Sequence, residues 1–334
     1  MALHGNHVAI STQKMVIEQL KKKRTADFNA EWKDLSKKIT DFSPFEQFFK
    51  NESKNRYNNV YLRDETRVTL KTGEYIHASY IQSTPEGQKL IAAQAPLQTT
   101  TEEFWQMALQ QKCQKIIMLC RVVEDGKIKS QQYWPKAAGE TLYFEKIDVQ
   151  NINVLQKIYK IGGKREVIKE TKIFITDSKT KEFLHSLIHV QYENWQDFSI
   201  PAVTNPIIDL YHSHFRTNKS GSMIVHCSAG IGRTGCFVGA FFAYELFSSS
   251  QLTSVKNQMS TAKVIKKRIA AVSKLREQRV QAVQTASQYV FLHILFIDLI
   301  QPNIEEDLSQ LKERFMTIAK RAAEVEKKRR QQKS

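Results

Sequence analysis

The sequence predicts an α/β (α+β) domain in which helices flank a central, twisted, mixed β-sheet. Short apolar, β-branched runs alternate with helical runs from Lys54 to about Ile300. Strands dominate the middle of that region, and two long helical runs close it. The chain has 334 residues, of which 41% are hydrophobic and 25% charged. This is the composition of a globular protein with the length for a sizeable core.

Each expected element is a run with the hydrophobic period of its class. Residues 1–45 predict a basic helical arm, with helical runs at Met15–Arg24 and Ala30–Phe42, ahead of a main domain over residues 46–300. The expected strands are Arg67–Leu70, Leu90–Ala93, Lys115–Cys120, Thr141–Ile147, Lys157–Ile161, Glu166–Thr176, Leu184–Tyr192 and Met223–His226. The expected helices are Thr101–Gln111, Ile207–Thr217, Gly235–Ser248, Val264–Gln278 and Thr285–Leu299.

Residues 301–334 predict an amphipathic, basic C-terminal helix and tail. Seven apolar residues recur at alternating steps of four and three, which places them on one helical face. They are Ile304, Leu308, Leu311, Phe315, Ile318, Ala322 and Val325. The stripe runs out into the basic cluster Lys327–Arg330. Three interpretations are open: a helix packed on its own domain, a coiled-coil or partner contact, and a contact with an anionic surface.

The net charge is +16, from 50 Lys and Arg against 34 Asp and Glu. It favours phosphorylated substrates, acidic membrane faces or nucleic acid as partners, or it serves solubility. The N-terminus lacks the pattern of a secretory signal, and no stretch approaches the roughly 20 apolar residues of a membrane span. There are only four cysteines, at 113, 120, 227 and 236. We therefore expect a reducing, cytoplasmic compartment. No cluster has metal-ligand spacing, and no cofactor is expected.

The run Ile224–Gly235 (IVHCSAGIGRTG) carries the chemistry. The apolar residues Met223–Val225 predict a buried strand, and Gly235–Phe247 predicts a buried helix. The glycine-rich segment between them is therefore a strand-to-helix loop. Such a loop directs successive backbone N–H groups at one point, where the helix dipole adds positive potential. This arrangement suits a phosphate dianion.

Two side chains of this loop have the chemistry of phosphate transfer. The positive potential favours the thiolate of Cys227, which is a nucleophile. The planar fork of Arg233 can hold two phosphate oxygens and follow their charge into the transition state. Gly230 and Gly232 permit close approach of the backbone. The hydroxyl of Thr234 can hydrogen-bond the sulfur and ease its departure.

Two other interpretations of the loop are weaker. Its glycines also spell the G-x-G-x-x-G of a dinucleotide-binding fold, which needs an acidic residue about 20 positions on, at the end of a second strand. No acidic residue lies at Thr253–Lys256, and Glu245 lies within the expected helix. A buried structural cysteine in a tight turn would leave Arg233 on the same loop unexplained.

The run His226–Gly235 is similar to the signature loop of the tyrosine-specific, cysteine-dependent protein tyrosine phosphatases. The resemblance extends over Lys54–Leu299. It implies the fold of that family, with Cys227 as nucleophile, Arg233 as phosphate clamp and His226 supporting the loop from behind. It also implies phosphate binding by the loop residues Ser228, Ala229, Gly230, Ile231 and Gly232.

Trp195-Gln196-Asp197-Phe198 resembles the mobile Trp-Pro-Asp loop of the family. The resemblance implies that Asp197 is the general acid that protonates the leaving phenolate, and then the base that activates water, with Trp195 supporting the loop. General acid–base catalysis contributes roughly 10²–10⁴ in rate. Gln196 replaces the proline of the family. We expect this to alter loop closure by about 0.4–1 kcal/mol without abolishing activity.

Other segments resemble the pocket of the same family. Tyr57 lies in the loop that sets pocket depth, which implies stacking on a phosphotyrosine ring. Asn59 stands where the family usually has an aspartate that holds the substrate backbone, which puts peptide affinity in doubt. Gln284 and Gln288 resemble the glutamine loop, which implies that they orient the hydrolytic water. The two remaining supports, bracing Arg233 and the acid loop respectively, are Glu124 and Lys129.

These features predict hydrolysis of phosphotyrosine in proteins through a cysteinyl-phosphate intermediate. The basic ends and several substitutions are similar to those of the small phosphatases of parasitoid-wasp bracoviruses, which would imply host-cell cytoplasm. The expected partners are tyrosine-phosphorylated proteins, with an anionic surface or another protein at the C-terminal helix. Gln196 and Asn59 leave open a weakened phosphotyrosine-binding module. The +16 charge leaves open a phosphatase of RNA 5′-phosphates or phosphoinositides, whereas nucleic-acid binding through the basic ends is not expected.

Overall fold

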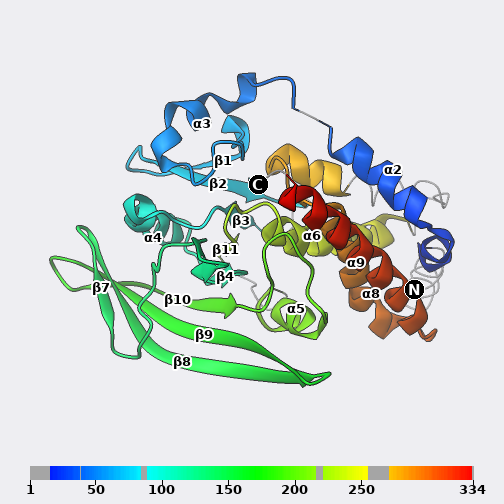
Figure 1. Ribbon diagram of the computed structural model, residues 1–334. Helices are drawn as coiled ribbons and strands as arrows, with labels where there is room; N and C mark the ends of the chain where they lie inside the picture. Colours follow the sequence, from blue (N-terminus) through cyan, green and yellow to red (C-terminus); the bar gives the residue numbers. More distant parts are fainter. Residues whose placement is uncertain (1–15, 38, 84–88, 216–220, 255–270, 333–334) are drawn as a thin grey trace.

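The computed structural model describes residues 16–37, 39–83, 89–215, 221–254 and 271–332. In this part of the chain, one mixed sheet has the strand order β1-β2-β3-β11-β4-β10-β9-β8-β7, and β5 and β6 form a separate hairpin (Figure 1). The strands are β1 (Arg67–Thr69), β2 (Tyr75–Ile81), β3 (Leu90–Ala93), β4 (Lys115–Met118), β5 (Val123–Glu124), β6 (Lys127–Ile128), β7 (Thr141–Tyr143), β8 (Ile147–Ile161), β9 (Lys164–Asp177), β10 (Phe183–Tyr192) and β11 (Met223–His226). The predicted mixed sheet with flanking helices is confirmed.

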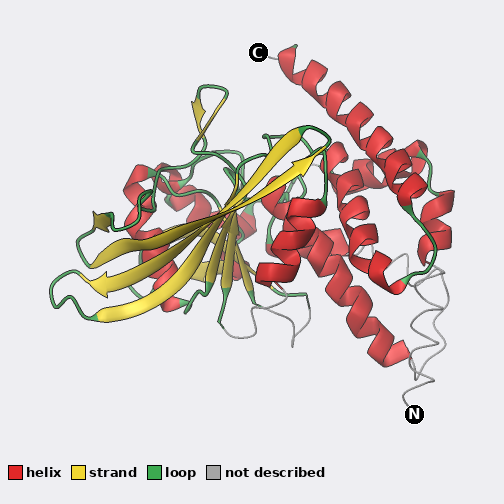
Figure 2. Cartoon of the chain, turned by 90° about the horizontal axis from the view of Figure 1, so that it is seen from below, coloured by secondary structure: helices red, strands yellow, loops and turns green. Residues whose placement is uncertain are grey.

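Most of the helices gather on one side of the strongly twisted sheet (Figure 2). Helix α6 packs against β11 and α8, and α8 in turn packs against α2 and α9. Almost every residue of α8 is buried, because neighbours surround it, and this explains its nearly continuous apolar sequence. The helices are α2 (Thr25–Leu35), α3 (Glu46–Lys50), α4 (Thr101–Gln110), α5 (Asn205–Leu210), α6 (Arg233–Ser254), α8 (Ala286–Ile300) and α9 (Ser309–Gln331).

Strand β11 lies in the middle of the parallel part of the sheet. It pairs in parallel with β3 on one side and with β4 on the other. All of its residues are buried, as expected for a parallel strand covered on both faces. Helix α6 begins at Arg233, so only residues 227–232 separate the carboxyl end of β11 from the positive end of that helix. Ligand sites of open α/β sheets form at this edge.

The outer part of the sheet differs from the prediction. The strand expected at Thr141–Ile147 is β7, which spans only Thr141–Tyr143, and the strand expected at Lys157–Ile161 is the end of the long β8. Strand β9 pairs with β8 along its whole length. Polar residues such as Gln156 interrupt the apolar pattern of β8 because that stretch is solvent-exposed. Cross-strand pairing, which the periodicity of one strand does not reveal, holds the hairpin together.

Three expected helices also differ. The helix expected at Ala30–Phe42 is α2, which ends at Leu35, and the one expected at Ile207–Thr217 is the short α5, followed by a π-helical turn over Tyr211–Phe215. The helix expected at Val264–Gln278 is described only over 271–278, and the basic stretch around 256–268 lies outside the described residues. Among the helices that are described, none is long and apolar enough to span a bilayer.

Helix α9 packs its apolar stripe on the chain's own domain. Leu311, Phe315 and Ala319 are buried, and the Phe315 ring meets the Phe28 ring edge-on at 5.0 Å. Further along, the stripe continues at the edge of a groove of about 550 Å³ between α2, α8 and α9. There Val325 is 49% exposed. The first interpretation of the stripe, a helix packed on its own domain, therefore describes its N-terminal half.

Candidate active site

The cysteine loop, residues 227–232, joins β11 to α6. Cys227 follows the strand directly and is 3% exposed. Gly230 has a φ of +70°, and a Cβ atom there would lie 2.1 Å from the Ala93 carbonyl oxygen. Only glycine fits this turn, because both its backbone conformation and the close approach of β3 exclude a side chain. The Ser228 carbonyl accepts a hydrogen bond from the Ala95 amide at 2.9 Å, which also ties the loop to the end of β3.

The buried guanidinium of Arg279 holds the loop's carbonyl groups. It donates to the carbonyls of Gly230 at 3.1 Å and Ala229 at 3.0 Å. It also donates to Nδ1 of His77, whose Nε2 in turn donates to the Val60 carbonyl. With their carbonyls bound behind the loop, the peptide units of this segment leave their N–H groups on the other side. Burial, followed by the nearby charge of Arg279, lowers the pKa of His77 to about 3, so this imidazole is neutral.

The loop's backbone donors have no acceptor among the described residues. Among the described groups, the N–H groups of residues 228–232 donate no hydrogen bond. Nε of Arg233 and the hydroxyl of Thr234 are likewise buried without a hydrogen-bond partner in the described chain, and Nη2 of Arg233 has only the ion pair with Oδ1 of Asp197 at 3.3 Å. Leaving buried donors unpaired is costly. Their convergence at one helix N-terminus points to an oxyanion as the missing partner.

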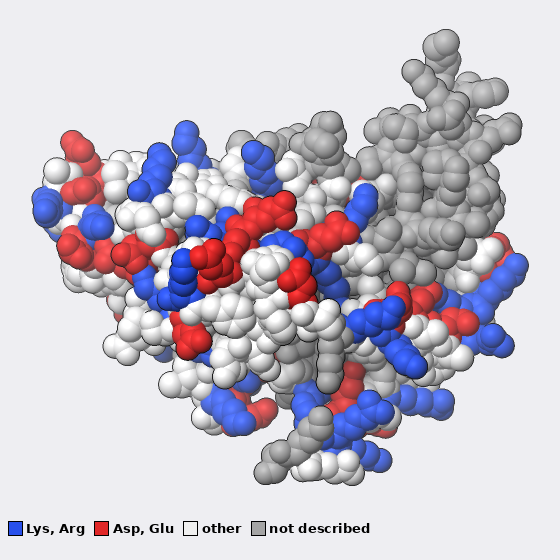
Figure 3. All heavy atoms as spheres, turned by 90° about the horizontal axis from the view of Figure 1, so that it is seen from above, with Lys and Arg blue, Asp and Glu red and all other residues white. Residues whose placement is uncertain are grey.

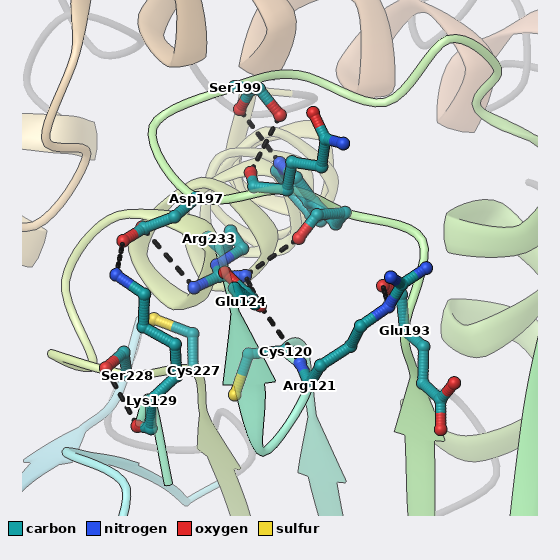
Figure 4. Close-up of polar contacts among 12 residues, drawn as sticks. Cys120, Arg121, Glu124, Lys129, Glu193, Asp197, Ser199, Cys227, Ser228 and Arg233 are labelled. Atoms are coloured by element: carbon teal, nitrogen blue, oxygen red, sulfur yellow. Dashed lines mark hydrogen bonds and ion pairs between the residues drawn. The ribbon is translucent and has the colours of Figure 1, made fainter. Parts of the chain in front are cut away.

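The other side of the Arg233 guanidinium is fixed by two acceptors (Figure 4). Its Nη1 donates to Oε1 of Glu124 at 2.6 Å and to the Trp195 carbonyl at 2.8 Å. Oε1 of Glu124 also accepts from the Arg121 amide at 3.0 Å. Because one edge of the guanidinium is held in this way, the opposite edge is oriented in advance for a bidentate ligand.

The acid loop, residues 195–199, folds over the cysteine loop. Asp197 points between two cations, with Oδ2 at 2.7 Å from Nζ of Lys129 and Oδ1 at 3.3 Å from Nη2 of Arg233 (Figure 4). Phe198 has a φ of +55°, the left-handed region that is strained for an aromatic residue. The Trp195 side chain is fully buried, and its indole N–H donates to the Ser199 carbonyl at 2.9 Å. The loop is therefore in a closed conformation that several contacts hold in place.

Tyr57 is tied to the cysteine loop through Ser228. The Ser228 hydroxyl donates to the Lys129 carbonyl at 2.8 Å, so the Tyr57 hydroxyl, 2.8 Å away, donates to Ser228. This bond fixes the Tyr57 ring, which is half-buried, beside the loop. Asn59 is exposed and lies further out, where it lines a hollow of about 590 Å³ together with Ile231 and others.

The two glutamines lie against Gly232. A Cβ atom at Gly232 would lie 2.8 Å from Oε1 of Gln284 and 3.3 Å from Nε2 of Gln288. The Gln284 amide donates to Oε1 of Gln288 at 3.1 Å. Nε2 of Gln288 has no partner among the described residues and is buried. The absence of a side chain at Gly232 lets both amides reach the cysteine loop.

Comparison with known proteins identifies the family. The model of the family described as "Protein-tyrosine phosphatase" matches residues 51–298. The chain belongs to this family. The phosphatase is 31% identical to the rat (Rattus norvegicus) "Tyrosine-protein phosphatase non-receptor type 20" over 293 residues, which cover 85% of this chain and 63% of the relative. It is 30% identical to human "Receptor-type tyrosine-protein phosphatase C" over 315 residues, which cover 90% of this chain and 22% of that protein.

A solved structure agrees with the family match. The crystal structure of the catalytic domain of human protein tyrosine phosphatase non-receptor type 18 superposes on this phosphatase with a TM-score of 0.69 at 26% identity. The match covers 85% of this chain and 98% of that one. The chain thus spans less than two thirds of the curated relatives named above, but nearly all of a solved catalytic domain.

A buried chain of hydrogen bonds supports the cysteine of this phosphatase from behind. His226 lies 3.0 Å, at Nδ1, from the Cys227 carbonyl, so Nδ1 carries the proton and donates. Burial lowers the pKa of His226 to about 4, so the ring is neutral and Nε2 accepts from the Tyr133 hydroxyl at 2.6 Å. The Tyr133 oxygen in turn lies 2.8 Å from Nε2 of His189. These three groups are a buried polar network with a fixed direction of donation.

Of the other thiols, Cys120 lies close enough to Cys227 and Arg233 to interact with their charges. Cys113, Cys120 and Cys236 are fully buried and free. Burial raises the pKa of each, to about 12 for Cys113 and further for the other two. They are structural apolar residues.

Sequence reasoning missed several residues that touch the site. Arg279, Tyr133 and His189 hold the cysteine loop from behind, and two residues of α9, Glu326 and Arg330, reach the glutamine loop and the acid loop. Only Arg279 left a signal, because it lies five residues before Gln284 and close to another arginine, Arg276. Two nearby arginines are normally predicted to be solvent-exposed, so the sequence alone does not reveal that Arg279 is buried.

Proposed function

We propose that the chain hydrolyses phosphotyrosine in proteins through a cysteinyl-phosphate intermediate. The observation that carries this proposal is the group of buried donors around Cys227 that have no hydrogen-bond partner among the described residues: the loop N–H groups, Nε of Arg233 and the Thr234 hydroxyl. Nη2 of Arg233 lies beside them and has only its ion pair with Asp197. A tetrahedral phosphoryl group accepts from the loop N–H groups and from Arg233 together, and the Thr234 hydroxyl is left to donate to the cysteine sulfur. A thiolate at their centre attacks a phosphorus atom held in this way.

In the first step, Sγ of Cys227 forms a bond to phosphorus while the bond to the phenolic oxygen breaks. Arg233 and the loop N–H groups bind the phosphoryl oxygens throughout, and they strengthen their hold as charge shifts onto those oxygens. Asp197, as the carboxylic acid, gives its proton to the departing phenolate. Its position between Lys129 and Arg233, closed over the cysteine loop, supports this role.

In the second step, water replaces the tyrosine. Asp197, now a carboxylate, takes a proton from that water while the water oxygen attacks phosphorus. The S–P bond breaks at the same time, and inorganic phosphate is released. Gln284 and Gln288 lie against Gly232, where their amides can orient the water. The unpartnered hydroxyl of Thr234 donates to the departing thiolate. Each half-reaction is served by groups of the chain itself.

Tyr57 supports phosphotyrosine over phosphoserine. Its hydroxyl bonds Ser228, which holds the ring upright at the side of the loop and deepens the pocket. A phosphate on an aromatic ring reaches the thiolate at the bottom, whereas one on the short serine side chain stops above it. Asn59 offers an amide to the substrate backbone where a carboxylate is usual in the family, so we expect weak binding of peptides.

Charge supports a local phosphate site more than a nucleic-acid surface. On the face drawn in Figure 3, basic and acidic side chains are interspersed over the described surface. The net charge of +16 is therefore not gathered there into the continuous basic field that binds a nucleic-acid backbone.

The test compares phosphate release from a phosphotyrosyl peptide, the matching phosphoseryl peptide, a 5′-triphosphorylated RNA and a phosphoinositide. We expect turnover on the first alone, and a loss of at least about 10³-fold in the Cys227→Ser variant. Turnover by wild-type protein equal to that of Cys227→Ser would leave only a binding module. Faster release from RNA or lipid would replace the proposed substrate class.

A further inference from the structure

Helix α9 touches both the acid loop and the start of α8 beside Gln284, and nothing in the proposed chemistry uses these contacts. It lies on α8, and its last turns reach toward the middle of the molecule (Figure 1). Seen from below, they project beyond the rest of the domain (Figure 2). Two residues one helical turn apart, Glu326 and Arg330, make the contacts.

Glu326 binds the start of α8. Its Oε1 accepts from the Ala286 amide at 2.7 Å, and its Oε2 accepts from the Ser287 hydroxyl at 3.1 Å. Ala286 is the first residue of α8, so its N–H has no partner within that helix, and a carboxylate at this end also meets the positive end of the dipole. Gln284 lies two residues before this cap. Glu326 therefore fixes the backbone from which Gln284 extends.

Arg330 binds the acid loop. Its guanidinium carbon lies 4.0 Å from the centre of the Phe198 ring, within the range of a cation–π contact. Nε of Arg330 donates to the Glu326 carbonyl at 3.2 Å, which orients the side chain. Phe198 directly follows Asp197 and is the residue with the left-handed backbone. A force on this ring therefore acts on the position of the catalytic carboxyl group.

The helix is anchored well enough to act as a fixed support. Lys312 pairs with Asp298 of α8 at 2.8 Å. Arg314 donates to the carbonyls of Leu20 and Lys21 at 3.1 and 2.8 Å. Phe315 is fully buried. These contacts lie about four to five turns before Arg330, so removing the Arg330 side chain leaves the anchor intact.

We propose that Arg330 and Glu326 are positioning residues of the phosphatase: Arg330 holds the acid loop closed over Cys227, and Glu326 holds the glutamine loop. The family's proline restrains the acid loop from within, and Gln196 lacks this effect. We infer that the contact with α9 restrains the loop from outside instead. The inference rests on the proposed function, because it concerns the delivery of a proton by Asp197.

The test compares two substrates that differ in how strongly their leaving group depends on protonation by Asp197. The value of kcat/KM covers only the steps up to departure of the phenol, so it is measured for a phosphotyrosyl peptide and for a phosphate ester of a strongly acidic phenol. That second phenol leaves without a proton. We expect Arg330→Ala to lower kcat/KM roughly 2- to 30-fold on phosphotyrosine, the range of a cation–π contact. On the acidic ester the change is expected to be less than about 2-fold.

Two variants serve as controls. Arg329→Ala removes the same side chain from the neighbouring, exposed position and is expected to change neither value. Arg330→Lys keeps a cation for the Phe198 ring and is expected to recover part of the loss.

Glu326→Gln is expected to slow hydrolysis of the phosphoenzyme, measured after a burst of phenol release, equally for both esters.

Three results would decide against the proposal. If Arg330→Ala equals Arg329→Ala on the peptide, Arg330 does not position the acid. If it loses the same factor on both esters, the damage is structural and the inference fails as well. In either case, wild-type turnover still supports the proposed function. Wild-type protein with no turnover on either ester would overturn both proposals together.

Discussion

The cysteine loop and the acid loop meet at one phosphate site, but the chain holds them in different ways. The cysteine loop continues the buried central strand β11. Hydrogen bonds from Arg279 and from the end of β3 hold its backbone, and the Ser228 hydroxyl adds side-chain bonds with Tyr57 and with the Lys129 carbonyl. The acid loop follows the end of β10 and is held mainly by side chains: Lys129 and Arg233 on Asp197, Arg233 on the Trp195 carbonyl, and Arg330 on Phe198.

Under the proposed function, this difference corresponds to two tasks. A loop that binds phosphate works best when its donors are fixed before the ligand arrives, since no energy is then spent on ordering them. A loop that delivers a proton has to open for substrate and product, so it is held by a few contacts that can be broken one at a time. The contacts of Lys129, Arg233 and Arg330 all stabilise the loop in the position described.

The largest effect is expected when the acid loop loses its chemistry but keeps its contacts. Asp197→Asn retains an oxygen for Lys129, yet it cannot donate an acidic proton. We expect kcat on a phosphotyrosyl peptide to fall roughly 10²–10⁴-fold. Binding of the peptide, measured by calorimetry, should change little, because the cysteine loop binds the phosphate. A loss below about 10-fold, or a loss of binding, would show that the two loops do not divide the work in this way.

An intermediate effect is expected behind the cysteine loop, where His77 makes the free energy of unfolding depend on pH. The pKa of His77 is about 3 in the folded chain, against 6.5 for an unperturbed histidine. Between these values the unfolded chain binds a proton that the folded chain does not, so the free energy of unfolding falls as the pH falls. The slope is about 1.4 kcal/mol per pH unit for one such histidine. His226, with a pKa of about 4, adds to it in the same direction.

The variant His77→Asn removes one of these protons and keeps a hydrogen-bonding side chain near Arg279. Urea unfolding at several pH values between about 4.5 and 6 is expected to give a shallower slope for this variant, by up to about 1.4 kcal/mol per pH unit. His212→Asn, at an exposed position, is the control. Equal slopes for wild type and His77→Asn would mean that His77 titrates normally in the folded chain.

The smallest effect is expected when proline is restored in the acid loop. The described hydrogen bonds of Gln196 use its carbonyl, which accepts from the Ser199 hydroxyl at 2.7 Å and from its amide. Gln196→Pro therefore removes no described hydrogen bond. It reduces the conformational entropy of the open loop, which favours the closed loop by about 0.4–1 kcal/mol, or roughly 2- to 5-fold in population. Rapid kinetics should show faster phenol release by about this factor. The same rate in Gln196→Pro and Gln196→Ala would mean that α9 already supplies the whole restraint.

The parts of the site that lie together in sequence could be predicted. Cys227, Arg233 and Thr234 share one loop, and the bounds of the strands expected at Leu90–Ala93 and Met223–His226 are those of β3 and β11. Their apolar, β-branched runs have the signature of a buried parallel strand. Local sequence sets these positions, so local sequence reveals them.

The supports could not be predicted, because each depends on a contact between distant residues of ordinary type. Arg279 and Gly230 are 49 positions apart, and Ala286 and Glu326 are 40 apart. An arginine or a glutamate on an amphipathic helix reads as solvent-exposed until the packing of that helix is known. The long hairpin of β8 and β9 was divided wrongly for a similar reason, because polar residues interrupt the pattern of an exposed strand.

Helix α9 lies beyond residue 298, the last residue that the family model matches. Substitutions that destroy the signature loop are expected to be eliminated by selection, because activity would be lost. Substitutions in the last turns of α9 leave the residues of the proposed mechanism in place. If Arg330 sets how long the acid loop stays closed, then the rate of this phosphatase can be adjusted over evolutionary time without touching its chemistry. Two chains with identical motifs can then differ in speed because of a residue that no motif contains.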